Sequence, residues 1–181
     1  VKKEVSEDGD CWVAAPLLGL GLQKKHLPQA INSCRVACKD FIKNNNDIQQ
    51  ALNVKKSSIS KVAKQAKYSK RGELIDEGHW GETWHMHVLA IILDIDIIGY
   101  DLKRKSLTCY SSTGIQIYFP NQIDLSIDAL QARNDFVLLE YNGSDHFDTL
   151  KRKDVSIQWK PPVFLSSMFD RKRKRDAYCK V

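Results

Sequence analysis

The chain has 181 residues, of which 43% are hydrophobic and 28% charged, and it carries a formal net charge of +6. This length suits one domain, and the composition is ordinary for a globular protein, which excludes a wholly disordered chain. No apolar run approaches the roughly 18 residues of a membrane span, and the opening VKKEVSEDGD does not resemble a signal peptide. We therefore expect no integral membrane association.

The basic excess is concentrated at the C-terminal end. Residues 170–181 contribute +4 of the net charge, so the remainder of the chain carries only +2. We therefore do not expect a nucleic-acid surface on the fold. The run RKRKR at 171–175 is interpreted as a solvated tail or linker, with a nuclear localisation signal as the alternative.

The cysteines indicate a reducing, cytoplasmic compartment. They form no CxxC pair and are odd in number, which argues against a disulfide framework and against a zinc ribbon. The five are Cys11, Cys34, Cys38, Cys109 and Cys179.

The first half of the chain predicts helices. The apolar stretch Trp12–Leu18 predicts one, in which Pro16 forces a late start or a bend because a proline past the first turn removes a hydrogen bond. Between Ser33 and Phe41 apolar positions recur at helical spacing, and the turn formers at 44–46 end that helix.

Two shorter helices are predicted next. Asp47 with Gln50 resembles a capping box for the first of them. Ser58 is predicted to cap the second, whose apolar face comprises Ile59, Val62, Ala63 and Ala66.

The segment after Gly81 predicts a largely buried helix. From Glu82 to Leu93 the chain is apolar on nearly every side, and a carboxylate at Glu82 favours a helix N-terminus. His85 and His87 lie two residues apart, so they point about 200° apart and cannot share a metal ion. We expect both to be partly exposed helix residues.

The second half predicts strands, which makes the fold class α+β with a mostly antiparallel central sheet. After the strands, Pro161 and Pro162 close the ordered region, and residues 163–169 are predicted as a last apolar segment. The predicted strands are Ile95–Leu102, Leu107–Tyr110, Ile115–Phe119 and Phe136–Tyr141.

Cys11 admits two interpretations. Free cysteine is among the most buried residue types, so one is an inert core residue. The other is a nucleophile at the start of a helix, where the helix N-terminus and a nearby imidazole lower the pKa of a thiol.

Among the five histidines, His146 has the context of a catalytic partner. It follows a predicted strand and the turn at 142–145 and opens His146-Phe147-Asp148. Residues two apart in a strand share a face, so Asp148 can accept the ring N–H and fix the tautomer, as in a catalytic triad. A surface His–Asp pair is the alternative.

Three elements together resemble the OTU (ovarian tumour) family of cysteine deubiquitinases, and the Lys-, Ile- and Asn-rich composition resembles its bacterial-effector or viral members. Family members typically carry Asp-Gly-Asn-Cys, a Trp-Gly element, and a His followed two residues later by Asp, Asn or His. The matching elements here are Asp8-Gly9-Asp10-Cys11-Trp12, His79-Trp80-Gly81-Glu82 and His146-Phe147-Asp148.

The resemblance implies a thiol protease mechanism without cofactor or metal. In it Cys11 attacks an isopeptide bond between ubiquitin and lysine, His146 moves the proton and Asp148 orients the ring. Backbone N–H groups of the loop Asp8, Gly9 and Asp10 would face the oxyanion, with Asp8 as a loop brace. The catalytic domain is expected over residues 1–160, with 161–181 as a basic extension or linker.

The expected partner is ubiquitin or a polyubiquitin chain. Trp80 and Gly143 are candidate substrate-binding residues near the site, although a core aromatic is an equally good interpretation of Trp80. Leu74 and Ile75, with the acidic residues at 76 and 77, suit an apolar patch of ubiquitin bordered by basic residues.

Two departures from the family pattern leave alternatives open. Asp10 stands where the family carries Asn and would raise the thiol pKa unless its carboxylate turns outward, and Pro16 interrupts the helix. One alternative is a catalytically impaired, ubiquitin-binding OTU fold. The other is a basic protein that binds nucleic acid or a membrane surface through its RKRKR tail.

Overall fold

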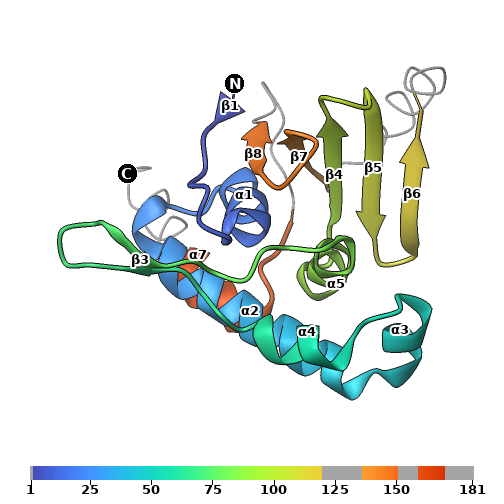
Figure 1. Cartoon of the computed structure of the whole chain (residues 1–181), viewed down its shortest axis with the longest axis horizontal. Coiled ribbons are helices and arrows are strands. Elements are labelled where there is room, and N and C mark those ends of the chain that lie inside the picture. Colours follow the sequence, from blue (N-terminus) through green and yellow to red (C-terminus); the bar gives the residue numbers. More distant parts are fainter. Residues whose placement is uncertain (1, 120–135, 151–158, 170–181) are drawn as a thin grey trace, which may run out of the picture.

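The computed structural model describes residues 2–119, 136–150 and 159–169, and its strands form a six-stranded sheet in the order β1-β8-β7-β4-β5-β6 (Figure 1). Neighbouring strands are antiparallel except β4 and β7, which are parallel. The bounds are β1 Lys2–Lys3, β4 Asp96–Asp101, β5 Ser106–Ser111, β6 Gly114–Tyr118, β7 Phe136–Tyr141 and β8 Phe147–Leu150.

Helices cover one face of this sheet. Helix α1 packs on β7 and β8, helix α5 packs on β4 and β5, and α2 lies across both helices. The helices are α1 Cys11–Gly19, α2 Leu27–Asn44, α3 Asn46–Ala51, α4 Lys56–Lys61, α5 Thr83–Leu93 and α7 Val163–Phe169, with a 3₁₀ turn at Lys24–His26. The architecture confirms the predicted α+β class and its mostly antiparallel sheet.

The main core lies between the helices and the sheet. Fully buried residues from α1, α5, β4 and β7 meet there, among them Leu17, Leu89, Ile97 and Leu139. Alternate strand residues such as Ile98 and Phe136 form a smaller cluster on the other face, as the two-residue period of a strand requires. The cluster on the helix-covered face of the sheet is therefore much the larger of the two.

The predicted apolar segment at 163–169 forms a helix that joins the main core. Leu165 of α7 is fully buried, and Trp159 donates a hydrogen bond of 2.6 Å to the Leu93 carbonyl at the end of α5. The RKRKR run lies outside the described residues.

Helix α1 tolerates its internal proline because its surroundings hold it. Every residue from Cys11 to Leu18 is buried, so packing rather than local propensity stabilises the helix. Pro16 lies inside the helix, whose nine residues continue to Gly19. The late start considered from the sequence is therefore wrong.

The helix ends in the 44–62 region differ from the sequence expectation. Helix α2 ends at Asn44 as predicted, but the capping box is wrong because Asn45 caps α3 without a side-chain bond. Ser58 lies inside α4, which follows Lys55 and ends before Val62. The carbonyl of Val62, the C-cap residue, accepts a hydrogen bond of 2.9 Å from Arg35 on α2, so a tertiary contact satisfies a carbonyl at this helix end.

Two short pairings escaped prediction. Strand β1 pairs with β8 at the sheet edge, and β2 Lys67–Tyr68 pairs with β3 Leu74–Asp76 in a separate hairpin that projects beside α2 in Figure 1. Strands of two or three residues are too short to show an alternating pattern. Among the described helices, none has the length and apolar character needed to cross a membrane.

The expectation that His85 and His87 are partly exposed is wrong. They are 0% and 8% exposed, because α5 is enclosed by the sheet and α2. His85 stacks on Trp84 with ring centroids 3.6 Å apart, and its Nδ1 accepts a 2.8 Å hydrogen bond from the Glu82 N–H. Burial lowers the pKa of His85 to about 3, so the ring is neutral in the folded protein.

This neutral histidine makes stability depend on pH. The pKa of His85 rises to its ordinary value of 6.5 on unfolding, so below pH 6.5 the unfolded chain binds a proton that the folded chain does not. We expect its contribution to be complete above pH 6.5 and to fall by about 2 kcal/mol at pH 5. Urea unfolding of wild type and His85→Gln, each at pH 5 and at a pH above 6.5, measures this change in the free energy of unfolding. Equal losses in both proteins would contradict the assignment.

Candidate active site

Cys11 is the first residue of α1 and is 1% exposed. Its Sγ lies 3.7 Å from the Asp145 carbonyl oxygen, to which the thiol donates, and it accepts a hydrogen bond from the Phe147 N–H. These two backbone groups flank His146 in the sequence. The thiol is therefore held against the turn that precedes β8.

The surroundings of Cys11 keep its thiol neutral. Burial raises the pKa of Cys11 to about 11, against the lowering effect of backbone N–H groups from Phe147 and Trp12. The carboxylates of Asp8 and Asp10 add smaller raising effects. Reaction at neutral pH therefore requires a base that takes the thiol proton.

His146 and Asp148 lie side by side at the start of β8. The Nε2 atom of His146 is 3.0 Å from Asp148 Oδ1, and its Nδ1 is buried without a hydrogen-bond partner among the described residues. A proton on Nε2 satisfies the carboxylate and leaves the Nδ1 lone pair free. The structure thus brings together the three predicted residues Cys11, His146 and Asp148.

Asp148 is held in its charged form. Burial raises the pKa of this carboxyl, but hydrogen bonds from Lys2, the Val5 N–H and His146 outweigh it and bring the pKa below the usual value. The Val5 N–H donates to Oδ1 at 2.9 Å, and Lys2 Nζ lies 2.8 Å from Oδ2. A charged, fixed carboxylate is what orients a catalytic imidazole.

Hydrogen bonds to the Asp8 carboxylate fix the loop before Cys11. Asp8 Oδ1 accepts a 2.9 Å hydrogen bond from the Asp10 N–H, and Asp8 Oδ2 accepts one from the Tyr68 hydroxyl. Gly9 has a φ of +84°, and a Cβ there would lie 2.4 Å from the Gly78 carbonyl oxygen. Only glycine therefore fits this position.

Arg35 organises this loop, and the sequence reasoning missed it. The guanidinium is 0% exposed and lies 2.5 Å from Asp10 Oδ1, so the carboxylate turns inward onto a cation. Asp10 Oδ2 accepts a 3.0 Å hydrogen bond from the Ala66 N–H. The guanidinium also donates to the carbonyls of Gly9 at 2.6 Å, Val62 at 2.9 Å and His79 at 3.0 Å.

A signal for Arg35 was present in the sequence. The buried stripe of α2 runs through Ile31, Cys38 and Ile42, and Arg35 lies on it at helical spacing. An arginine on an apolar stripe requires a buried acidic partner. Burial raises the pKa of Asp10 and lowers that of Arg35, and their mutual attraction opposes both shifts.

Gly81 lies against Trp12, the residue after the nucleophile. A Cβ on Gly81 would lie 2.6 Å from Trp12 Cγ, and Trp12 Nε1 donates a 3.1 Å hydrogen bond to the His79 carbonyl. Trp80 is half-buried at the margin of the core, and its Nε1 donates to Glu77 Oε2 at 3.1 Å.

Gly143 lies in the turn between β7 and β8, with a φ of +82°. Asn142, which was not predicted to matter, organises this turn because its Oδ1 accepts N–H groups of Ser144, Asp145 and His146 at 2.9 to 3.2 Å. An Asn-Gly pair signals such a turn, although not which backbone groups the side chain would bind.

Leu74 and Ile75 lie apart from the thiol, on the β2–β3 hairpin. They are 42% and 70% exposed, and the hairpin is joined to the nucleophile loop through the Tyr68–Asp8 bond. A separate hollow of about 420 Å³ lies beside the turn that contacts Cys11. Its lining includes Gly81 and Glu82 before α5, Tyr141 of β7, and Asp145 and Phe147.

No protein-family model matches the sequence, and no curated protein matches it either. Solved structures do match. An OTU deubiquitinase from Wolbachia pipientis wMel superposes with a TM-score of 0.54 at 14% identity, covering 86% of this chain and 91% of that one. The chain has the OTU fold.

Two further OTU structures agree with this assignment. The Wolbachia enzyme bound to ubiquitin gives a TM-score of 0.53 at 13% identity and covers 86% of this chain and 98% of its own. The viral OTU domain protease from Dera Ghazi Khan virus gives 0.50 at 18% identity, with coverages of 83% and 80%. The resemblance found in the sequence is therefore confirmed at the level of the OTU fold.

The Arg35–Asp10 pair makes a measurable prediction. Replacing Arg35 by Met leaves Asp10 as an uncompensated buried carboxylate, which we expect to cost about 3 to 5 kcal/mol of unfolding free energy. Adding Asp10→Asn removes the charge and keeps an acceptor for the Ala66 N–H, so the double variant should be more stable than Arg35→Met alone. Urea unfolding of wild type, Arg35→Met, Asp10→Asn and the double variant measures the coupling energy between the two positions. Additive changes in the free energy of unfolding would show that the two side chains do not stabilise each other.

Proposed function

We propose that the protein is a cysteine deubiquitinase that hydrolyses isopeptide bonds between ubiquitin and lysine. The observation that carries the proposal is the placement of the Cys11 thiol against the turn of His146, whose ring is bonded to Asp148 and keeps Nδ1 free. The OTU fold supports it, since one solved relative is an OTU deubiquitinase bound to ubiquitin.

In the proposed reaction, His146 Nδ1 accepts the proton of Cys11 Sγ as sulfur attacks the carbonyl carbon of the ubiquitin C-terminal residue. The tetrahedral intermediate collapses when the imidazolium returns this proton to the lysine nitrogen, which leaves as an amine. Water, deprotonated by His146, then hydrolyses the thioester and restores the thiol. Asp148 stabilises the imidazolium in both halves of the reaction.

In the loop Asp8, Gly9 and Asp10, the backbone N–H groups of Asp8 and Gly9 are proposed to face the oxyanion, because the Asp10 N–H already donates to Asp8 Oδ1. The close approach of Gly9 to Gly78 and the bonds of Asp8 support a rigid loop, and rigid donors stabilise a developing charge without reorganisation. Asp10 is turned onto Arg35, so its charge is compensated rather than opposed to the oxyanion.

The raised pKa of Cys11 favours a mechanism in which the thiol loses its proton during the reaction over one that starts from a preformed thiolate. A thiol with a pKa of about 11 is not a standing thiolate at neutral pH. The sulfur is proposed to lose its proton to His146 as the substrate binds. The same observation favours a second candidate function, an OTU fold that binds ubiquitin without cleaving it.

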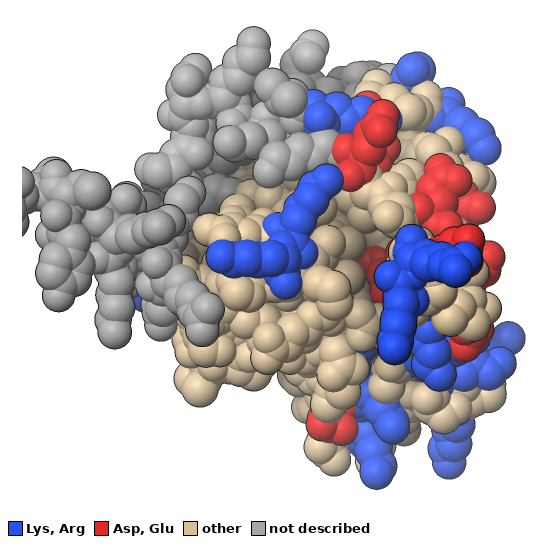
Figure 2. Space-filling model, turned by 90° about the vertical axis from the view of Figure 1, so that its left-hand side faces the viewer, with Lys and Arg blue, Asp and Glu red and all other residues tan. Residues whose placement is uncertain are grey.

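A third possibility, binding to nucleic acid or to an anionic membrane surface, has less support. On the face shown in Figure 2, the described Asp and Glu side chains lie among the Lys and Arg side chains, with uncharged surface between them. Such mixed charge is unlike the continuous basic stripe that nucleic-acid binding favours.

Covalent capture tests the proposed function. Wild type, Cys11→Ala and His146→Ala are incubated with ubiquitin that carries a C-terminal electrophile, and intact masses are recorded. We expect one ubiquitin on wild type, none on Cys11→Ala and a strongly slowed reaction of His146→Ala. Cys109→Ala, changed in the smaller core cluster, is the control and should react like wild type.

The outcomes separate the candidates. A folded wild type that binds ubiquitin but forms no adduct would establish the binding module instead. Hydrolysis of ubiquitin chains would exclude a role limited to anionic surfaces, whereas no reaction and no binding would remove ubiquitin as the partner.

Leu74, Ile75, Trp80 and Gly143 are proposed to contact ubiquitin. Exposed apolar side chains such as Ile75 gain the most from burial against an apolar patch. We expect Ile75→Glu to lower kcat/KM by about 10-fold through KM, with kcat and stability unchanged. Val163→Glu is the matched control, because Val163 is 93% exposed on α7. Equal effects of the two variants would remove the hairpin from the substrate site.

A further inference from the structure

The short strand at the start of the chain contacts the triad carboxylate. Lys2 Nζ lies 2.8 Å from Asp148 Oδ2 and 2.6 Å from Glu140 Oε1, and the Val5 N–H donates to Asp148 Oδ1. Both oxygens of Asp148 are thus bonded by residues that precede the nucleophile loop.

Lys2 also resolves a local repulsion. Glu140 on β7 lies directly opposite Asp148 on β8 in the antiparallel register, and like charges at opposed positions destabilise a sheet. The Lys2 ammonium bonds to both carboxylates, and these hydrogen bonds raise the pKa of Lys2 above its usual value. The cation is therefore permanent over the range in which enzymes work.

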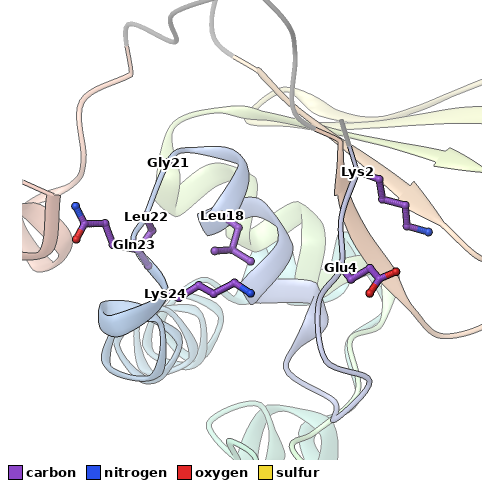
Figure 3. Close-up of a pocket in the computed structure, with 7 residues that line it drawn as sticks. All are labelled: Lys2, Glu4, Leu18, Gly21, Leu22, Gln23 and Lys24. Carbon is purple, nitrogen blue, oxygen red and sulfur yellow. The ribbon is translucent and has the colours of Figure 1, made fainter.

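Strand β1 is held to the sheet by its pairing with β8. It consists of two residues, paired with β8, and borders a hollow of about 750 Å³ (Figure 3). Across this hollow lie Leu18, Leu22 and Lys24, from α1 and the connection to α2. Its contacts next to the site include the pairing with β8 and the ion pairs of Lys2 with Asp148 and Glu140.

We propose that Lys2 is a positioning residue for the triad: its ammonium fixes the Asp148 carboxylate, which holds the His146 ring toward Cys11, and compensates the paired charges of Asp148 and Glu140. This inference rests on the proposed function. It assigns a role in the reaction to a residue outside the three sequence elements of the site.

The inference has an electrostatic consequence with a definite sign. Removing a cation favours proton binding at every titrating group nearby, and removing an anion does the opposite. The pH profile of the reaction at Cys11 therefore shifts to higher pH without Lys2 and to lower pH without Glu140. Among the described residues, the charged groups around Cys11, His146 and Asp148 include Lys2 from β1, Glu140 from β7, Asp145 from the turn with Lys103 near it, and Asp8 and Asp10 from the loop with Arg35 bound to Asp10.

The experiment measures the rate of ubiquitin adduct formation between pH 5 and pH 9 on the full chain. For Lys2→Met we expect a shift to higher pH of about 0.2 to 0.7 unit, as for an exposed ion pair, and a maximal rate lowered roughly 3- to 10-fold. Lys2→Arg should behave like wild type, and Glu140→Gln should shift the profile to lower pH. Lys24→Met, which removes a lysine from the same hollow, is the matched control and should change neither quantity.

Each outcome decides a point. A Lys2→Met profile that coincides with wild type overturns the positioning role, as does an equal shift from Lys24→Met, which would indicate a general effect of net charge. Thermal unfolding of the same variants separates a loss of fold from a loss of rate, and Lys2 is exposed enough for the variant to fold. A wild type that forms no adduct at any pH overturns the proposed function, and this inference with it.

Discussion

The buried ion pair between Arg35 and Asp10 is the interaction on which the site depends. One guanidinium on α2 binds the Asp10 carboxylate and the Gly9 carbonyl in the loop before Cys11, and it also binds carbonyls at two other places in the chain, Val62 and His79. These segments otherwise belong to a loop, a helix end and the approach to α5. A charge pair of this kind gains little net energy over apolar packing, but it defines which backbone groups meet, and here they meet around the nucleophile.

The features that sequence could predict are those written in local patterns. Helix α5 is apolar on nearly every side and strand β7 is a short run of apolar and aromatic residues, and both were found at nearly their observed bounds. His146 and Asp148 were paired from a spacing of two residues, which a strand converts into adjacency whatever the rest of the fold does. The link from this pair to Cys11 came from the resemblance, since no local pattern joins residues so far apart in sequence.

What escaped prediction was long-range. Val62 was expected on the apolar face of a helix, yet α4 ends before it and its carbonyl binds Arg35, and β1 forms by pairing with β8 far along the chain. His87 was expected to be a partly exposed helix residue, whereas its burial follows from the enclosure of α5. In each case a tertiary contact overrides a local preference, and such contacts leave at most an indirect trace, such as an arginine on an apolar stripe.

The neutral state of the Cys11 thiol also affects its chemistry when no substrate is present. Peroxides oxidise thiolates far faster than thiols, and access to the sulfur limits the reaction further. A thiol that is 1% exposed, with its hydrogen directed to the Asp145 carbonyl, offers little thiolate and little access. Burial and a raised pKa therefore both disfavour conversion of the Cys11 thiol to sulfenic acid, an oxidation that would remove it as a candidate nucleophile.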